Sequence, residues 1–326
     1  MATLKIEIPI HIKDDQHYAK IVDFFRDFSF NARLLDEEYN FQVRVMYEKE
    51  ENQDDWNLSS GRIELLTNIS GIADCTNNTL ITGKKWYHSF HDLDGNYHIV
   101  EHDDNYALDE LASDEIKDIV IGFVMAIILA DPSINMYCIA ISIYFDDMLI
   151  RKEILLKFSI HNQCVDMYPD LFRNPVALEQ AWNWIKKNTS LYGKRDRSPM
   201  AFSALTYILA RDYHEAILYS MIGLESIYSS KHEKGITEKL KKRIPLVLPG
   251  IDSQQIKNLY KIRSDVVHGN IQLGICLSMP EAIENDDEYE NNGILAAALL
   301  FASVRKLIEK DSTAISFKEI TEYSYE

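Results

Sequence analysis

The sequence has few cysteines, no long hydrophobic run and no secretory signal pattern in its first residues. Its four cysteines (Cys75, Cys138, Cys164 and Cys276) lie far apart and form no C-x-x-C pair, which argues against a disulfide framework and a structural zinc site. The most apolar stretch, residues 119–130, is much shorter than the roughly 20 residues that span a bilayer. We therefore expect a cytoplasmic protein with reduced thiols and no membrane-spanning segment.

Basic residues are too few to balance the acidic ones, since 34 Lys and Arg against 51 Asp and Glu leave a net charge of −17. The imbalance is uneven: residues 1–165 hold 14 basic and 29 acidic residues, whereas residues 186–243 hold 12 basic and 6 acidic ones. A basic stretch between acidic flanks could guide an RNA backbone and still suppress indiscriminate binding. The same lysines could equally form solvated helix faces, so charge alone leaves both interpretations open.

Common patterns for phosphate and metal binding are also missing. Residues 82–85 lack the earlier glycine of a phosphate-binding loop, and in residues 92–96 the glycine stands at the wrong position for a calcium loop. Four histidines (His88, His91, His98 and His102) crowd together and could conceivably hold zinc. However, His88 and His91 would point to opposite faces of a strand, and no cysteine lies nearby. We expect a polar hairpin face there, with no metal and no cofactor.

The first part of the chain, residues 1–165, has the patterns of an α+β domain. Alternating or buried apolar residues predict strands at residues 4–12, 41–45, 137–144 and 149–160. Asp94-Gly95 predicts a tight turn between two strand-like segments. Helical spacing appears at residues 18–28 and 114–130, with Asp114 as the expected N-cap and Pro132 after the second helix. These elements predict a small antiparallel sheet with a helix against it.

From residue 166 to residue 326 the spacing is helical almost throughout. Helices are predicted at residues 176–188, 201–229, 233–247, 253–268 and 291–310, of which residues 201–229 form one helix or two with a break near Asp212. Ser198 before Pro199 suits an N-cap, Ser253 is the expected N-cap of the fourth helix, and Gly269 is its stop signal. An acidic loop is expected at residues 281–292. Such a series of helices predicts an all-α bundle.

The most informative segment is residues 259–270. Arg263 and His268 lie five positions apart, polar Ser264 and Asp265 follow the arginine, and Gly269 follows the histidine. Upstream, residues 216–227 have helical spacing and carry Glu225. In these features the chain resembles the HEPN family of RNA-cleaving proteins, and most closely its ApeA-like branch. The resemblance covers about residues 175–310 and does not extend to the first half.

The resemblance implies a dimeric endoribonuclease that works without metal. It assigns acid/base catalysis to His268, phosphate stabilisation to Arg263, supporting polar roles to Ser264 and Asp265, and orientation of Arg263 to Glu225. Ser264 stands where many active members have Asn, Asp or His. The basic residues Lys239, Lys241, Lys242 and Arg243 are candidates for contact with the RNA backbone.

These residue types suit the chemistry of RNA cleavage by its own 2′-OH. The reaction needs a base, an acid and a cation on the phosphate oxygens. Histidine, with a pKa near ~6.5, can give or take the proton, and the planar guanidinium matches phosphate geometry. Positions five apart sit about 140° around a helix, so Arg263 and His268 would not share one narrow face. A two-fold dimer would bring two such pairs together and supply both acid and base.

Three hypotheses follow. In the first, the protein is a HEPN-type endoribonuclease in antiphage defence or a toxin, and its first half is a sensor or target-recognition module. It would bind RNA, a second copy of itself and a regulatory protein or phage-derived trigger, but no membrane. The second is a non-catalytic HEPN dimer that binds nucleic acid, nucleotide or a partner protein. The third is an interaction protein that functions through its acidic half. For the motif itself, the structural alternative is that Arg263 pairs with Glu225 or Asp265 and His268 favours the helix dipole.

Overall fold

The chain forms two compact units in the computed structural model. The structure describes residues 2–12, 14–34, 37–47, 60–69, 72–74, 79–81, 86–91, 97–102, 105–107, 111–134, 138–145, 147–157, 159–189, 197–209, 213–229, 234–270 and 286–317. The first unit comprises Met1–Val124 and Asn135–Leu156, and the second comprises Met125–Ile134 and Lys157–Glu326. The sequence suggested a change of unit at residue 165. By this division the second unit runs from residue 157 onward and also includes the last six residues of an apolar helix and the four residues after it.

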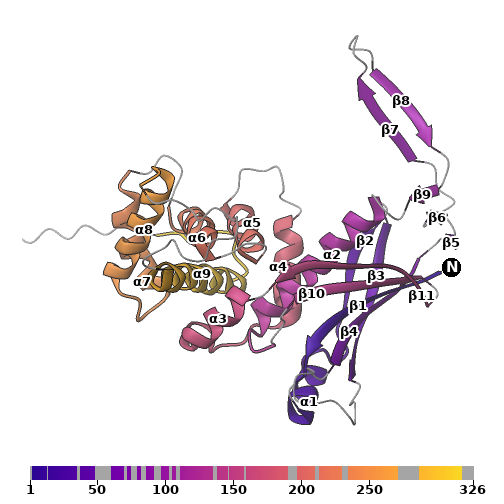
Figure 1. The fold of residues 1–326 in the computed structure, drawn as a ribbon, viewed down its shortest axis with the longest axis horizontal. Coiled ribbons are helices and arrows are strands. Elements are labelled where there is room, and N and C mark those ends of the chain that lie inside the picture. The colour runs from indigo at the N-terminus through magenta and orange to yellow at the C-terminus, as the bar shows by residue number, and fades with distance from the viewer. Residues whose placement is uncertain are drawn as a thin grey trace, which may run out of the picture. The chain divides into compact units, whose positions relative to one another are not determined.

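A six-stranded sheet is the centre of the first unit (Figure 1). Its strands follow the order β11-β10-β1-β4-β3-β2, and the β10–β1, β1–β4, β4–β3 and β3–β2 pairs are antiparallel. Their bounds are Ala2–His11 for β1, Ser29–Leu34 for β2, Glu37–Tyr47 for β3, Ser60–Ile69 for β4, Cys138–Phe145 for β10 and Met148–Lys157 for β11. The mixed α+β character predicted for this half is confirmed.

Alternation of side chains gives this sheet one apolar face. In β1, Ile6 is fully buried and lies opposite Leu65 of β4 and Ile143 of β10, so three strands turn apolar residues to the same side. The intervening residues carry charge: Lys5 pairs with Glu7 at 3.4 Å on the other face. The period of two in the sequence therefore fixes which face of the sheet is buried.

Two helices complete the first unit: α1 (Asp15–Phe24) and the part of α2 (Leu111–Ala130) that ends at Val124. Asp14 caps α1 by accepting a 2.7 Å hydrogen bond from the backbone N–H of His17. The ring of Phe123 in α2 stacks on Phe30 of β2, with centroids 5.0 Å apart, and on Phe28. Stacked rings of this kind add about 0.5–1.5 kcal/mol per pair beyond the area they bury.

Some boundaries in this unit differ from those predicted. Helix α2 begins at Leu111, so Asp114 lies inside it and is not its N-cap; the prediction was wrong because it took the first good capping residue before an apolar run. Strand β11 ends at Lys157, and Ile160 belongs to the next helix. The expected strands at residues 4–12, 41–45 and 137–144 correspond to β1, β3 and β10.

The remaining strands form two small sheets. Strands β5 (Ile72–Asp74), β6 (Thr79–Ile81) and β9 (Asn105–Ala107) pair in the order β5-β6-β9. Strands β7 (Trp86–His91) and β8 (Tyr97–His102) form the predicted antiparallel hairpin. The proposed Asp94-Gly95 turn lies outside the described residues. Among the described residues, no group of three or more His, Cys, Asp or Glu side chains could hold a metal ion.

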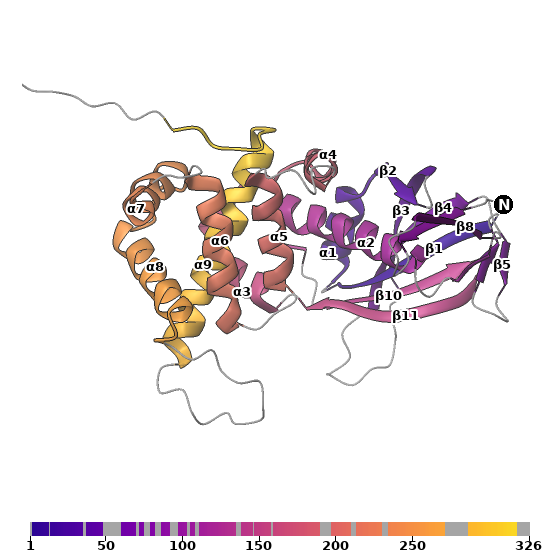
Figure 2. The ribbon, with the colours of Figure 1, turned by 90° about the horizontal axis from the view of Figure 1, so that it is seen from above.

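The second unit is built from helices (Figure 2). They are α3 (Ser159–Met167), the short 3-10 helix η1 (Pro169–Phe172), α4 (Leu178–Thr189), α5 (Arg197–Leu209), α6 (Tyr213–Tyr228), α7 (Ile236–Val247), α8 (Ser253–Val267) and α9 (Asp286–Glu309). Because α5 ends at Leu209 and α6 begins at Tyr213, the alternative with two helices is confirmed. The proposed break near Asp212 lies outside the described residues. Trp182 and Trp184 of α4 are 6% and 1% exposed, as expected for core residues.

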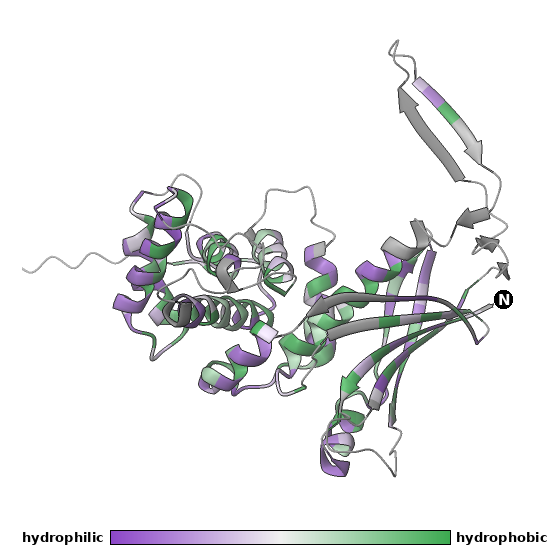
Figure 3. Ribbon diagram, viewed as in Figure 1, coloured by the Kyte–Doolittle hydropathy of each residue, from purple (hydrophilic) through white to green (hydrophobic). Residues whose placement is uncertain are grey.

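Helix α9 is the centre of this unit and packs against α3, η1, α4, α5 and α6. Figure 3 shows hydrophobic residues along α9 and many polar residues on α7 and α8. Within the described part of the chain, residues Tyr289–Glu309 form one helical stretch long and apolar enough to cross a membrane, and 83% of its apolar window is buried inside the structure. These residues form a buried core helix here.

Close approach of α6 to its neighbours depends on Gly223. A Cβ atom at this position would lie 2.6 Å from Cδ2 of Leu300 in α9 and 3.1 Å from Cβ of Ala204 in α5. Both distances are shorter than normal van der Waals contact, so α6 can pack at this distance because residue 223 has no side chain.

A buried arginine joins α9 to the end of α2 and to the chain before α4. Arg305 is 2% exposed, and its Nη1 donates to the carbonyl oxygen of Leu129 at 2.6 Å. Its Nη2 donates to the carbonyl oxygen of Asn174. Burial lowers the pKa of this guanidinium to about 10. The three residues belong to the second unit, where the arginine satisfies main-chain acceptors that would otherwise be left without a donor.

Three details of the helical unit correct the sequence analysis. Asp252, not Ser253, is the N-cap of α8, because it forms a capping box with Gln255. Ser198 lies inside α5, and its hydroxyl has no hydrogen-bond partner among the described residues, so it does not cap that helix. The acidic segment expected as a loop at residues 281–292 is helical from Asp286 onward; its earlier part lies outside the described residues.

Candidate functional site

Helix α8 carries the predicted motif and packs its inner side against the rest of the unit. Ile256, Leu259 and Val266 are its buried residues, and their spacing of three and seven positions defines one stripe of the helix. Arg263 falls on the same stripe, four positions after Leu259 and three before Val266. A charged side chain therefore occupies a position where the pattern otherwise requires an apolar one, and it needs a partner.

That partner is Glu225 of α6. Its Oε1 lies 3.5 Å from Nε of Arg263, and the two side chains are only 19% and 24% exposed. Neither of these two atoms makes a hydrogen bond within the described part of the chain, so the contact is an ion pair without aligned hydrogen bonding. The guanidinium carbon also lies 5.8 Å from the ring centroid of Tyr260, one turn earlier in α8.

Burial changes the pKa of the carboxyl group in this pair. It raises the pKa of Glu225 above the usual value, and the positive charge of Arg263 offsets this only in part. Desolvation therefore outweighs charge pairing at Glu225. A carboxylate in this state holds the guanidinium less firmly than a fully ionised, hydrogen-bonded partner would.

The end of α8 determines where His268 lies. The backbone N–H of Asn270 donates to the carbonyl of Asp265 at 2.8 Å, and that of Gly269 donates to the carbonyl of Val266 at 3.1 Å. These two bonds, with a φ of +73° at Gly269, form a Schellman motif that stops the helix. His268 is the C-cap residue and is exposed. Gly269 is thus the stop signal that the sequence predicted.

The two residues after Arg263 have structural contacts at the same turn. The carbonyl oxygen of Ser264 accepts a 2.9 Å hydrogen bond from the backbone N–H of His268. Asp265 is half-buried, and its Oδ1 accepts a 3.2 Å hydrogen bond from Nδ2 of Asn270. Sequence reasoning gave no role to Asn270. A polar side chain directly after a helix-stopping glycine was the signal that could have identified it.

The structure brings together some of the predicted residues and separates others. Glu225 and Arg263 meet between α6 and α8, and Asp265 meets Asn270 at the end of α8. Arg263 faces inward, whereas His268 is exposed at the helix end, in line with the separation around the helix expected from their spacing. One chain therefore offers a single histidine beside a single, inward-facing arginine.

The predicted RNA-binding residues of α7 differ in their exposure and in their hydrogen-bond partners. Nζ of Lys241 donates to both carboxylate oxygens of Glu238, at 2.9 and 3.1 Å, and this hydrogen bond lowers the pKa of Glu238. Lys242 is exposed, and Lys239 is half-buried. Nη1 of Arg243 donates to the last carbonyl of α6, that of Tyr228, at 2.6 Å.

Arg243 therefore has a structural role at the end of α6, because its guanidinium also lies 5.0 Å from the ring centroid of Phe317. The charge of Lys257 in α8, together with that of Lys242, contributes to the low pKa of Glu238. Exposed positive charge thus extends from α7 to α8, where Lys242 and Lys257 are both accessible to an anionic polymer.

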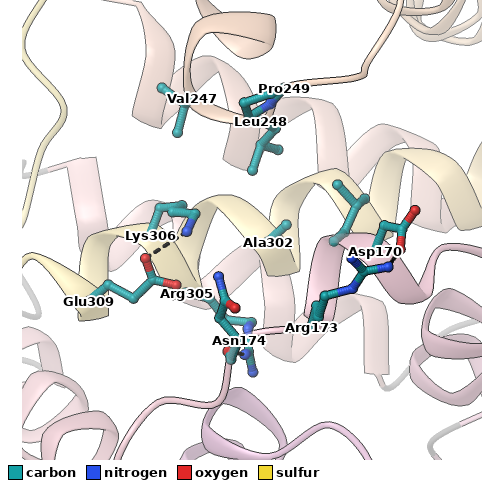
Figure 4. A pocket seen from close by; sticks show the side chains of 11 residues that line it. Asp170, Arg173, Asn174, Val247, Leu248, Pro249, Ala302, Arg305, Lys306 and Glu309 are labelled. Atoms are coloured by element: carbon teal, nitrogen blue, oxygen red, sulfur yellow. Dashed lines mark hydrogen bonds and ion pairs between the residues drawn. The ribbon is translucent and has the colours of Figure 1, made fainter.

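A pocket of about 170 Å³ lies elsewhere in the helical unit (Figure 4). It contains none of the predicted catalytic residues. Its lining residues come from η1 and the chain after it, the end of α7 and the start of its following turn, and α9: Asp170, Leu171, Arg173, Asn174, Val247, Leu248, Pro249, Ala302, Arg305, Lys306 and Glu309.

The cations of this pocket already have partners. Nη2 of Arg173 lies 2.5 Å from Asp170, Nζ of Lys306 lies 2.6 Å from Glu309, and Arg305 donates to main-chain carbonyls. We therefore assign no ligand to the pocket, and the candidate site remains the α6–α8 contact with the exposed end of α8.

Comparison of the chain with protein-family models, with curated proteins and with solved structures gives no significant match.

Proposed function

We propose that this protein is a metal-independent endoribonuclease of the HEPN type, with its active site at the end of α8. The helical unit would be the HEPN-type bundle, and a second copy would complete the site. The observation that carries the proposal is the charged pair within the buried stripe of α8: Arg263 lies 3.5 Å from Glu225 and five positions before His268, the exposed C-cap residue. Residues that merely stabilise a helix contact would pack better there as apolar side chains.

Each residue has a defined part in the proposed reaction. The 2′-OH of the RNA attacks the adjacent phosphorus, the imidazole of one His268 removes the hydroxyl proton, and the imidazolium of the second chain's His268 protonates the departing 5′ oxygen. Arg263 turns its Nη groups toward the non-bridging oxygens as negative charge builds up. Glu225 orients Arg263, and Ser264 and Asp265 support the turn. Lys242 and Lys257 would attract the RNA backbone.

Antiphage defence or toxin activity is the biological role that fits this reading. The acidic α+β unit would then respond to a regulatory protein or a phage-derived trigger. In this proposal the protein binds RNA and a second copy of itself, requires no cofactor and acts in the cytoplasm.

The test is an RNA cleavage assay in EDTA with matched variants of α8. We expect His268→Ala to lower the cleavage rate by about 100-fold or more, and Arg263→Ala to lower it by a similar factor. Asn258→Ala removes an exposed, uncharged side chain from the same helix and should cut at nearly the wild-type rate. Arg263→Lys keeps the charge but loses the planar fork, so its rate should also fall.

Two results would reject the enzyme. Wild-type protein that leaves every RNA intact, or His268→Ala protein that cuts as fast as wild type, contradicts the proposal. RNA binding without cleavage would instead favour the non-catalytic HEPN dimer. Sedimentation tests the composite site, because a protein that is monomeric while it cuts RNA could not use two copies of His268.

A further inference from the structure

Helix α6 has a half-exposed strip that lies between α5 and α8. The residues of this strip are partly accessible, and they include Leu218, Tyr219, Ile222 and Glu225. With about 100° between successive residues, Tyr219 and Glu225 lie some 60° to either side of Ile222. Tyr219 contacts α5, and Glu225 contacts α8 through Arg263.

The contact on the α5 side is a stack of two tyrosines. The rings of Tyr207 and Tyr219 are nearly parallel, with an interplanar angle of 12° and centroids 5.1 Å apart. Tyr207 is nevertheless 50% exposed. One face of its ring lies against Tyr219, and half of the Tyr207 side chain is accessible to solvent. Two packed helices hold this flat, exposed aromatic surface in place.

The stack lies close to the candidate site along the same helix. Tyr219 precedes Glu225 by six residues, which corresponds to about 9 Å along the axis of α6. A polynucleotide with one phosphate at Arg263 could therefore extend across the strip and bring one of its bases to Tyr207. The other large aromatic residues considered for this role, Trp182 and Trp184, are buried and offer no open ring face.

We propose that the exposed ring of Tyr207 stacks on an unpaired nucleobase, so that the substrate of the Arg263–His268 site is single-stranded RNA. This inference rests on the proposed function and specifies its substrate class. Bases within a duplex have both faces covered by neighbours, so an aromatic platform selects for unpaired ones. Tyr219 acts behind Tyr207, where it fixes the orientation of the ring.

Binding can be measured apart from cleavage in full-length protein that carries His268→Ala. The probe is a fluorescently labelled single-stranded RNA, compared with the same RNA annealed to its complement and with an abasic version. We expect Tyr207→Ala to raise the Kd for the single strand roughly 5- to 100-fold, as loss of one base stack does. Tyr207→Phe, which keeps the ring, should restore binding.

Met200→Ala serves as the matched control, because Met200 is a 52% exposed apolar residue of the same helix without a ring. It should bind as the parent does. The preference for single strand over duplex, and for the intact over the abasic strand, should largely disappear in Tyr207→Ala. Thermal unfolding of each variant shows that it is folded.

The inference is overturned if Tyr207→Ala binds the single strand as tightly as the parent, or if the parent binds duplex equally well. It is also overturned if Tyr207→Ala converts a dimer of the free protein to a monomer, because the ring would then belong to a subunit interface. Wild-type cleavage separates the two proposals. If wild type cuts RNA and Tyr207→Ala makes no difference, the stacking inference alone fails, whereas absence of both cleavage and binding rejects the proposed function.

Discussion

Glu225 and Arg263 are paired by charge but not by a hydrogen bond. Their Oε1 and Nε atoms are 3.5 Å apart, and both atoms are buried without a hydrogen-bond partner among the described residues. A buried ion pair repays its desolvation cost only when its geometry is good. The pair therefore adds little to stability.

The raised pKa of Glu225 predicts how stability depends on pH. The folded state holds this proton more tightly than the unfolded state, so the contribution is present below the unfolded pKa and is lost as the pH rises through the folded pKa. Wild type should therefore lose free energy of unfolding relative to Glu225→Gln as the pH rises from about 4.5 toward neutrality. Urea denaturation of both proteins at several pH values measures this difference.

Glu238→Gln is a control for which the pH dependence of stability should have the opposite sign. The hydrogen bond from Lys241 lowers the pKa of Glu238, so its contribution is present at higher pH and is lost as the pH falls through the folded pKa. Wild type should gain stability relative to this variant as the pH rises. A Glu225→Gln difference with the same sign as that of Glu238→Gln would mean that Arg263, and not burial, dominates at Glu225.

Gly269 and Gly250 provide a matched pair of substitutions. Their φ angles are +73° and +92°, and a Cβ atom would meet nothing within 4 Å at either position. Each alanine variant should therefore lose about 1–2 kcal/mol of stability through backbone strain alone. Only Gly269→Ala disturbs the turn that holds His268, so only this variant should lose RNA cleavage. Equal cleavage rates for the two variants would show that the turn at Gly269 is not needed for RNA cleavage.

Because His161 is buried, we expect the protein to lose stability in acid. His161 is fully buried beside Phe301, with ring centroids 5.2 Å apart, and burial lowers its pKa to about 4. The unfolded state binds the proton first, so the free energy of unfolding should fall as the pH drops from about 6.5 to about 4, by at most about 1.4 kcal/mol per pH unit.

Urea titrations of wild type and His161→Leu test this expectation, because the variant should lack that part of the slope. Measurements above about pH 7.5, where the imidazole is neutral in both states, give the intrinsic cost of the substitution. An unchanged slope in His161→Leu would contradict the prediction.

Gly223→Ala should destabilise the helical unit by about 1–3 kcal/mol through overpacking. The new Cβ would lie 2.6 Å from Cδ2 of Leu300, whose side chain is fully buried. The double variant with Leu300→Ala makes room for it, so the two substitutions should cost less together than the sum of their separate costs. Strict additivity in denaturation experiments would show that Leu300 moves aside without strain.

Periodic features of the chain could be predicted, while contacts between distant segments could not. The alternation of Leu4, Ile6 and Ile8 predicted β1 because a half-buried strand repeats every two residues. The N-cap of α8 was misplaced by one residue because Asp252 and Ser253 are both good caps. The choice follows from Gln255, which completes a capping box only with Asp252.

At the candidate site, too, local features could be predicted, whereas contacts between distant segments could not. The turn after His268 could be predicted from Gly269. The sequence allowed Arg263 either Glu225 or Asp265 as a partner, and the structure pairs it with Glu225; the catalytic roles of these residues stay predictions. The stack of Tyr207 on Tyr219 was missed because it depends on how α5 and α6 pack, which no spacing within either helix specifies.

The central position of α9 has a consequence for synthesis of the protein. This helix contacts α3, η1, α4, α5 and α6, yet it follows all of them in the chain. While a ribosome makes the protein, the earlier helices must wait with their apolar faces uncovered until α9 leaves the exit tunnel. Exposed surface of this kind attracts chaperones and promotes aggregation. A ribonuclease assembled in this order would have its candidate catalytic helix, α8, outside the ribosome before the core that supports it exists.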